Sequence, residues 1–298
     1  MILRRFIFEP EFSLKNSTVA IVGLGLMGGS LGLALKEKNV CRRVIGLVRR
    51  ETAVTEARQL GVVDEATTDP AEALGQAEVV IFSTPVRIIL RQLADYAPLF
   101  KPGAVITDMG STKQAIVQTM ADLPDGLHPL GSHPMCGKEV TGMAAAEADL
   151  YRGAPWILTP LARTPPAATA LIRELAVAIG SNPRELAADR HDLLVAAISH
   201  LPYTMAASLV LAARQVAARD PVVWEVAASG FRDTSRVAAS DVTMMLDILQ
   251  TNQGAVQYML RLAQNQLARF AEALDTNDEA QLRQMMEEAA HQRQALYE

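Results

Sequence analysis

The chain has 298 residues, more than one ordinary globular core needs and about right for two domains. Half of the residues are apolar and 20% are charged, a balance that excludes a disordered chain. The net charge of -5, from 28 basic and 33 acidic side chains, leaves no basic surplus for binding nucleic acid.

The N-terminal residues, the length of the apolar runs and the cysteines indicate the cellular compartment. Residues 1–12 lack the unbroken apolar core of a signal peptide, because charged residues and a proline interrupt them. Further along, no window approaches the ~20 uninterrupted apolar residues that span a bilayer. Two cysteines, Cys41 and Cys136, fit a reducing cytosol better than a secreted disulfide scaffold. We therefore expect a soluble cytoplasmic protein.

The first half alternates short runs rich in valine and isoleucine with helical patterns. The runs predict buried strands at 18–24, 43–48, 78–83 and 104–108. The segments between them predict crossover helices at 28–38, 51–60, 85–96 and 112–123. Apolar runs near Leu130 and at 156–159 extend the same sheet. This order is typical of an α/β domain with a parallel sheet and helices on both faces.

The composition changes after a proline-rich stretch at 159–166, which reads as a linker or domain edge. Long helices are expected at 189–218 and 252–274, and a last helix at 279–298. The sequence thus predicts two domains, 1–160 and 161–298, of which the second is all-helical. Apolar faces on its long helices exceed what about 130 residues can cover, so we expect a homodimer through this domain.

A glycine-rich motif follows the first predicted strand and opens a helix. In Gly23, Gly25 and Gly28, the first glycine permits the tight turn, the second lets the backbone approach a pyrophosphate, and the third allows close helix packing. The helix start, at Leu26 and Met27, supplies free amides and a partial positive charge for phosphates. The motif predicts a dinucleotide site.

Two arginines stand where the choice between NAD and NADP is made. An acid about 20 residues after the motif would favour NAD, but this position carries Arg49 and Arg50. Two guanidiniums suit a 2′-phosphate, with charge-assisted bonds of ~1.5 to 3 kcal/mol each. The sequence therefore predicts NADP, with NAD possible, and the alternative is a solvated basic turn.

Polar residues gather in three further places. They lie at 107–113, after a strand of the predicted sheet, at 131–139, after the next one, and at 191–192 with 199–202, in the first long helix. Open parallel sheets bind ligands at the carboxyl ends of their strands. These three groups are therefore expected to ring one cleft between the domains.

The chain resembles prephenate and arogenate dehydrogenases over nearly its whole length. Six motifs occur in the order of that family: GLGLMGGS at 23–30, STPV at 83–86, TDMGSTK at 107–113, HPMCG at 133–137, HD with SHLP at 191–202, and GFRDTSR at 230–236. The resemblance implies a Rossmann-type domain, an all-α dimerisation domain and oxidative decarboxylation of a cyclohexadienyl substrate in tyrosine biosynthesis. It implies no metal.

The resemblance also assigns roles to residues. It makes His133 the general base, and it makes Ser111 a hydrogen-bond partner of both the substrate hydroxyl and the cofactor side of the site. A neutral histidine near pH 7 suits that proton transfer, and the alternative is a structural histidine. The following four residues are expected at the cofactor: Ser83, Thr84, Pro85 and Asp108. His128 and His291 are left as structural or surface residues.

The remaining roles concern the substrate, which carries two carboxylates. The resemblance implies that Arg236 binds one of them through its planar fork, with Arg232 and Lys138 as possible assistants. His191 orients substrate or stabilises the helix start. His200 touches ligand or holds the kink before a proline. A glutamate matching Glu139 pairs with the Arg236 position in some relatives and would act as a gate.

Three residues depart from many relatives. Arg49 replaces an acid, Tyr203 replaces a second histidine after SHLP, and Met245 replaces a tryptophan. The last two leave open whether a keto or an amino side chain is preferred. Two rival hypotheses remain: a β-hydroxyacid dehydrogenase, which needs a lysine in the second domain although none follows Lys138, and a non-enzymatic NADP-binding redox sensor.

Overall fold

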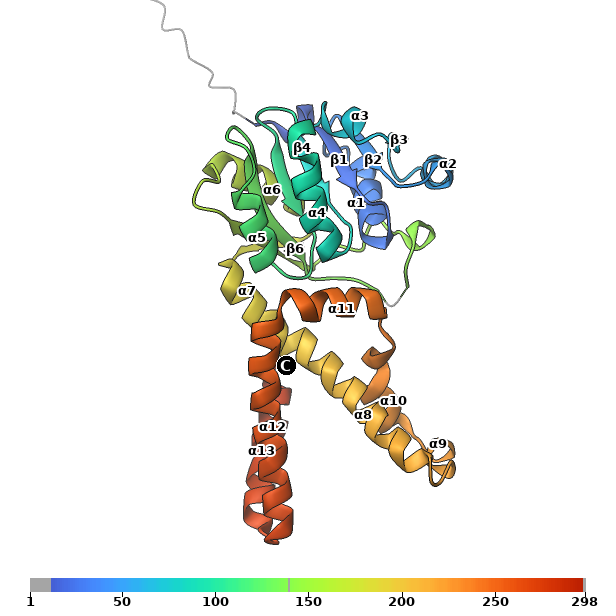
Figure 1. Ribbon diagram of the computed structural model, residues 1–298, viewed down its shortest axis with the longest axis vertical. Helices are drawn as coiled ribbons and strands as arrows, with labels where there is room; N and C mark the ends of the chain where they lie inside the picture. Colours follow the sequence, from blue (N-terminus) through green and yellow to red (C-terminus); the bar gives the residue numbers. More distant parts are fainter. Residues whose placement is uncertain (1–11, 139, 297–298) are drawn as a thin grey trace, which may run out of the picture.

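The computed structural model describes residues 12–138 and 140–296, and shows an α/β domain joined to a helical domain (Figure 1). The stretch 1–11, in which no signal peptide is expected, lies outside the described residues, as does Glu139. The two domains of the expected fold class are therefore present, in the expected order along the chain.

The α/β domain is built on an 8-stranded sheet with the order β3-β2-β1-β4-β5-β6-β7-β8. Its strands are β1 Thr18–Val22, β2 Arg43–Leu47, β3 Glu65–Thr67, β4 Val79–Phe82, β5 Val105–Asp108, β6 His128–Pro134, β7 Pro155–Pro160 and β8 Asn182–Glu185. Strands β1 to β6 are mutually parallel, as expected, and β7 pairs antiparallel with β6. The order reverses between β1 and β4, which is where Rossmann-type sheets bind dinucleotides.

Helices cover both faces of this sheet because side chains alternate along each strand. On β1, Val19 and Ile21 join the core beneath α1, α2 and α6, whereas Ala20 and Val22 join the core beneath α3, α4 and α5. The helices are α1 Leu26–Glu37, α2 Glu51–Leu60, α3 Pro70–Leu74, α4 Val86–Tyr96, α5 Gln114–Ala121 and α6 Pro166–Ala178.

The sheet domain continues beyond the expected boundary after residue 160. Strand β8 pairs with β7, and α6 packs against both, so the segment 166–185 belongs to the first domain. The proline-rich stretch 159–166 is thus the connection from β7 to α6 rather than a linker between domains. On this topology the boundary moves to the connection between β8 and α7.

The helical domain extends away from the sheet as two diverging arms (Figure 1). Its elements are α7 Ala188–Val195, a π-helical turn η4 Ala196–His200, α8 Leu201–Ala217, α9 Val222–Glu225, α10 Ser229–Ser235, a 3-10 turn η5 Arg236–Ala239, α11 Val242–Thr251, α12 Gln253–Asp275 and α13 Glu279–Ala295. Both long helices expected from the sequence are confirmed. The π-helical turn precedes Pro202, which lacks a backbone donor, so the helix continues instead of breaking.

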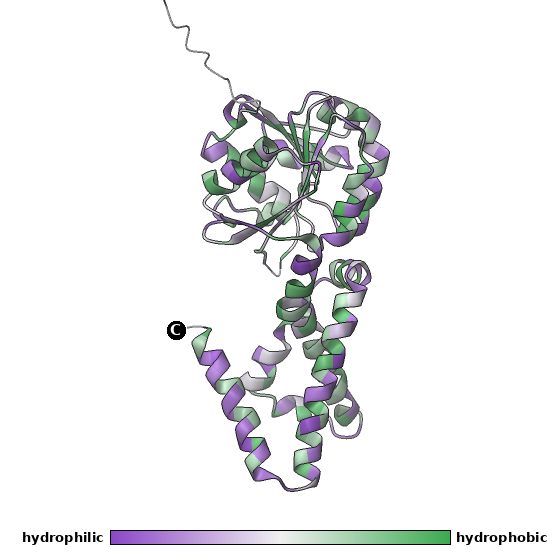
Figure 2. Ribbon diagram, turned by 90° about the vertical axis from the view of Figure 1, so that its left-hand side faces the viewer, coloured by the Kyte–Doolittle hydropathy of each residue, from purple (hydrophilic) through white to green (hydrophobic). Residues whose placement is uncertain are grey.

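Apolar side chains remain exposed on both arms. Figure 2 shows hydrophobic segments along the helices of this domain. Among the described residues, Ile198 is 68% exposed and Leu267 is 54% exposed. The continuous helix Ala188–Ala217 is long and apolar enough to cross a membrane by length and composition alone, with 22% of its most apolar window buried. A helix that meets a second protein chain passes the same test.

Candidate functional site

The glycine-rich turn joins β1 to α1. At two of its three glycines, a side chain would clash with neighbouring atoms. Gly23 has a φ of +95°, and a Cβ there would lie 2.7 Å from Thr84 Cγ2. A Cβ on Gly28 would lie 2.0 Å from the Gly23 carbonyl oxygen. Gly25 is different, since a Cβ there would meet nothing within 4 Å. The first and third glycines therefore close the turn, and the second leaves its backbone open to an approaching group.

The groups around this opening fit a dinucleotide. Helix α1 begins at Leu26 and Met27 without a side-chain cap, so its first amides are available for phosphate oxygens. Ser83, Thr84 and Pro85 stand opposite, at the end of β4. The Ser83 hydroxyl is buried and has no hydrogen-bond partner in the described part of the chain, although buried polar groups normally have one. The turn thus offers an open backbone, helix amides and a spare hydroxyl.

Arg49 and Arg50 follow β2, on the side of the turn where the ribose of a dinucleotide lies in sheets of this order. Both side chains are exposed, and Arg50 is the residue before α2. Within the described ranges neither arginine takes part in an ion pair. Their charges are therefore available to an anion from solution.

A buried ion pair shapes the loop between β5 and α5. Lys113 Nζ contacts the Asp108 carboxylate, and both side chains are 0% exposed. Asp108 also accepts hydrogen bonds from the backbone amides of Gly110 (2.7 Å) and Ser132 (2.9 Å). Burial raises the pKa of Asp108 and lowers the pKa of Lys113, with each partner opposing the other's shift. Internal donors engage the Asp108 carboxylate, so this geometry favours a structural role, and the expected contact of Asp108 with the cofactor stays a prediction.

Ser111 lies in the same loop and has a different environment. Its side chain is half-buried, and the hydroxyl makes no hydrogen bond to any other described residue. It is therefore free to bind a ligand at the carboxyl end of β5.

Two histidines and an aspartate form a chain that crosses from the sheet to the helical domain. His133 Nδ1, on β6, lies 2.9 Å from His191 Nε2, on α7. His191 Nδ1 lies 2.8 Å from Asp192 Oδ1. Asp192 accepts hydrogen bonds from the backbone amides of Lys113 (2.7 Å) and Gln114 (2.9 Å). The expected meeting of three polar groups is thus confirmed for the segments around residues 111, 133 and 191.

The hydrogen bonds from His133 through His191 to Asp192 determine the tautomer of each histidine ring. A carboxylate accepts, so His191 Nδ1 carries the hydrogen and donates it to Asp192. His191 Nε2 is then an acceptor, and His133 Nδ1–H donates to it. The remaining nitrogen of His133, Nε2, keeps its lone pair. His133 is partly exposed, whereas His191 and Asp192 are both 1% exposed.

The surroundings of His133 and His200 disfavour a charged ring. Burial lowers the pKa of His133 well below its usual value, and positive charge at His191, Lys113 or His200 adds to this effect. Burial likewise lowers the pKa of His200 to about 4. His200 Nδ1 lies 3.2 Å from Asn252 Nδ2, whose amide also donates to the Asp192 carbonyl (2.7 Å). Of the two roles expected for His200, this contact favours holding the helix turn.

Further contacts between the domains involve residues that the sequence did not single out. Asp247, on α11, accepts from Arg87 Nε at 2.5 Å and from the Arg87 amide at 3.3 Å, at the start of α4. Thr251 and Thr112 share a hydrogen bond of 2.8 Å. Asp247 follows no motif, and no local signal in the sequence identifies it.

Other expected substrate residues lie outside this cluster. Lys138 pairs with Glu147, and Arg232 pairs with Asp233 at 3.2 Å with both side chains exposed. Arg236 begins η5, which packs against α8, and its side chain is exposed in the single chain. The expectation of a buried Arg236 guanidinium is therefore wrong for the isolated chain. Tyr203 is half-buried in the first turn of α8, and the expected gate at Glu139 lies outside the described residues.

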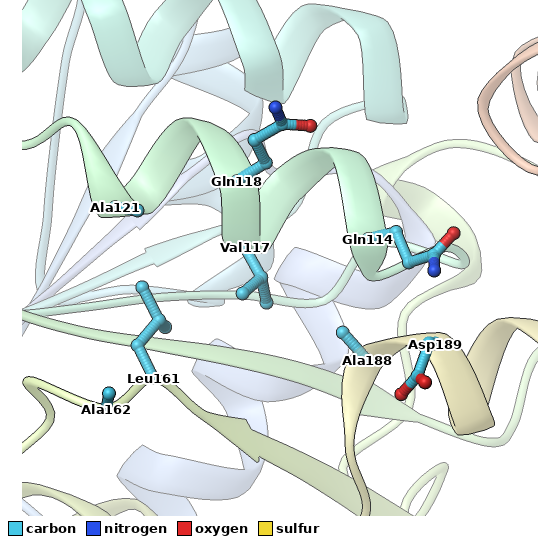
Figure 3. Close-up of a pocket in the computed structure, with 8 residues that line it drawn as sticks. All are labelled: Gln114, Val117, Gln118, Ala121, Leu161, Ala162, Ala188 and Asp189. Atoms are coloured by element: carbon cyan, nitrogen blue, oxygen red, sulfur yellow. The ribbon is translucent and has the colours of Figure 1, made fainter.

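A shallow groove runs between α5 and the start of α7 (Figure 3). Val117 and Leu161 face each other across it, and Gln114 and Asp189 stand at one end. The remaining lining residues are Gln118, Ala121, Ala162 and Ala188. None of the site residues expected from the sequence lines it, so the groove is separate from the histidine chain.

Two family models match the chain. The nucleotide-binding domain of prephenate dehydrogenase matches residues 31–182, and its dimerization domain matches residues 187–288. Their boundary agrees with the connection between β8 and α7.

Similar proteins give the same result. A prephenate dehydrogenase from Bacillus subtilis is 36% identical over 81% of this chain, which spans 66% of that relative's length. A cyclohexadienyl dehydrogenase from Zymomonas mobilis is 33% identical over 93% of this chain and 95% of its own. These relatives support neither a β-hydroxyacid dehydrogenase nor a redox sensor.

Solved structures also match nearly end to end. Synechocystis arogenate dehydrogenase is 30% identical, with a TM-score of 0.82 over 94% of this chain and 99% of that one. Prephenate dehydrogenase from A. aeolicus, in complex with hydroxyphenyl propionate and NAD+, is 27% identical to this chain. The TM-score is 0.88, and the match covers 96% of this chain and 100% of that one.

Proposed function

The chain belongs to the prephenate dehydrogenase family and is a pyridine-nucleotide-dependent oxidoreductase, and from this premise we propose that His133 is its general base and NADP its preferred cofactor. The observation that carries the proposal is the chain from His133 through His191 to Asp192. It leaves one imidazole nitrogen unprotonated at the carboxyl edge of the sheet, where a dinucleotide and a substrate meet.

The reaction is an oxidation followed by loss of carbon dioxide. When bound in the glycine-rich turn, the dinucleotide would supply the acceptor for the hydride that leaves the ring carbon bearing the hydroxyl. His133 Nε2 takes the hydroxyl proton, and decarboxylation makes the ring aromatic. Ser111, whose hydroxyl has no hydrogen-bond partner among the described residues, hydrogen-bonds the substrate hydroxyl and holds it toward His133. Asp192 and His191 hold the ring of His133 in the tautomer that accepts this proton.

The two exposed arginines support NADP over NAD. Arg49 and Arg50 present two unshared cations at the ribose end of the site, where the 2′-phosphate of NADP carries about two negative charges. The A. aeolicus relative was solved with NAD+, so NAD is the alternative.

Arg236 supplies a planar cation for a substrate carboxylate. It lies on the helical domain against α8, the helix that begins beside His200. Lys138, which is held by Glu147, and Arg232 are the reserve candidates. The relatives are named for prephenate, arogenate and cyclohexadienyl substrates, which include both a keto and an amino side chain. Tyr203 and Met245 are therefore the positions at which a preference between these two substrate side chains should be sought.

We infer that the functional unit is a cytoplasmic homodimer. The match to a dimerization domain and the exposed apolar faces of both arms support it, because a second copy would cover those faces.

A four-way assay tests the proposed activity. Prephenate or arogenate is paired with NAD or NADP, and reduced cofactor is followed by absorbance. The proposal expects turnover with at least one substrate and a higher kcat/KM with NADP. Nucleotide binding without turnover of either substrate would reject it.

A further inference from the structure

The segment 143–151, which follows the β6 strand of His133, lies against the first half of α1. We name it the clamp segment. Its 3-10 turn Met143–Ala145 packs on α1 at Gly29, where a Cβ would lie 3.0 Å from Ala146 Cβ and 3.4 Å from Met143 Cγ. Gly29 therefore permits the close approach. This glycine belongs to the GLGLMGGS motif, yet dinucleotide binding gives it no role.

Two hydrogen bonds connect the clamp segment to α1. The amide of Glu147 donates to Ser30 Oγ at 2.9 Å, and Ser30 is 0% exposed. The Tyr151 hydroxyl donates to the carbonyl oxygen of Met27 at 2.6 Å. Met27 lies between the second and third glycines of the turn, so the second bond reaches the first turn of the helix whose amides face the phosphates.

The Tyr151 side chain is held in place independently of these bonds. It is 0% exposed, and its ring lies 5.4 Å from that of Trp156, on β7. Its oxygen also lies 3.7 Å from Met109 Sδ, in the loop that carries Ser111. Burial raises the pKa of Tyr151 well above its usual value, so the hydroxyl stays protonated and can donate. One fixed hydroxyl thus contacts both the glycine-rich turn and the β5–α5 loop.

We propose that Tyr151, assisted by Ser30, is a positioning residue that holds the start of α1 in the geometry that binds the dinucleotide. The proposal rests on the cofactor site proposed above. Without the hydroxyl, the turn loses one restraint and spends part of its time in geometries that do not bind. Cofactor affinity then falls by the fraction of molecules that remain competent. Chemistry at His133 is unaffected once the cofactor is bound.

The test is Tyr151→Phe, which removes the hydroxyl and keeps the ring on Trp156. Kd is measured for reduced NADP and NADH by nucleotide fluorescence, and steady-state kinetics follow. We expect both Kd values to rise about three- to tenfold, the effect of one net hydrogen bond. The kcat at saturating cofactor and the KM of the cyclohexadienyl substrate should stay within about twofold of the wild type, since the restraint acts on cofactor binding alone.

Thr159→Val is the matched control, because Thr159 Oγ1 is a buried hydroxyl on the neighbouring strand that has no hydrogen-bond partner within the described chain. It should leave both Kd values unchanged. An unchanged Kd in a folded Tyr151→Phe protein, or an equal rise in the control, would overturn the proposal. If Tyr151→Phe does not fold, Ser30→Ala must show the rise in Kd, and its absence there rejects the proposal equally.

Gly25→Ala separates this proposal from the cofactor site on which it rests. The methyl group meets nothing within 4 Å in the free protein, so folding is preserved and only an approaching cofactor is obstructed. If Gly25→Ala binds both nucleotides normally, the proposed cofactor site is wrong. If Gly25→Ala loses binding and Tyr151→Phe does not weaken it, the site stands and the positioning role fails.

Discussion

Replacing His191 with phenylalanine tests whether the histidine chain acts in catalysis. The substitution keeps a buried aromatic ring but removes the acceptor 2.9 Å from His133 Nδ1. Asp192 keeps its bonds to the amides of Lys113 and Gln114, so the contact between the domains at this point is preserved.

The expected loss of rate follows from the change in charge at His133. Before proton transfer, the bond to His191 joins neutral groups and contributes about 0.5 to 1.5 kcal/mol. After His133 takes the proton, the same bond has a charged donor and contributes about 1.5 to 3 kcal/mol. Only the difference, roughly 1 to 2 kcal/mol, stabilises the transition state. We therefore expect kcat to fall about 5- to 30-fold.

His133→Asn and the double variant complete the test, because His191 acts only through His133. His133→Asn should lower kcat by roughly 10² to 10⁴ with cofactor Kd unchanged. The double variant should be no slower than His133→Asn alone. The measurements are kcat at saturating substrate and cofactor, with circular dichroism to confirm folding. Additive losses of kcat in the double variant would refute the proposal that His191 acts through His133. Near-normal kcat in His133→Asn would refute the proposal that His133 is the general base.

The remaining expectations concern the cofactor, the substrate, pH and assembly. Arg49→Ala should weaken NADP much more than NAD, and equal effects on both Kd values would contradict the proposed preference. Arg236→Lys should raise KM for the cyclohexadienyl substrate at least tenfold with NADP binding unchanged, since the planar fork is lost; an unchanged KM in a well-folded protein would make Arg236 structural. His200 is neutral when folded, with a pKa of about 4, against an unfolded value near 6.5. The unfolded chain binds a proton at His200 at a higher pH than the folded chain does. This residue alone should therefore remove about 3 kcal/mol of stability as pH falls from 6.5 to 4, and His200→Asn should abolish that part of the loss in denaturant titrations. Light scattering should show a dimer at micromolar concentration, and a monomer would contradict the assembly.

The fold could be predicted wherever a strand is buried on both faces. β1, β2, β4 and β5 are short runs rich in valine and isoleucine, buried along nearly their whole length, and this burial explains why each was visible in the sequence. β3 and β8 were missed because they lie at the two edges of the sheet. β3 is Glu-Ala-Thr, and β8 is Asn-Pro-Arg-Glu, whose proline is tolerated on an edge strand. Edge strands need little apolar side chain, so composition does not reveal them.

Only the site residues that stand in recognisable motifs could be predicted from the sequence. His133, His191 and Ser111 stand in segments with recognisable spacing. Motif position does not reveal that Asp108 is buried, and its ion pair with Lys113 depends on how the loop folds back on β6. Asp247 stands 160 positions from its partner Arg87, beyond the reach of any local pattern.

Two carboxylates of the helical domain bind the starts of two helices in the sheet domain. Asp192 accepts from the amides of Lys113 and Gln114 at the start of α5, and Asp247 accepts from the amide and guanidinium of Arg87 at the start of α4. Helix starts carry unpaired amides and partial positive charge, so each carboxylate stabilises its helix and joins the domains at the same time. α4 follows the Ser83 segment and α5 follows the Ser111 segment, which places both contacts beside the proposed cofactor site. Asp192 also holds His191, so a contact between the domains shares its carboxylate with the ring that orients His133. One carboxylate therefore takes part both in joining the domains and in holding the base in place.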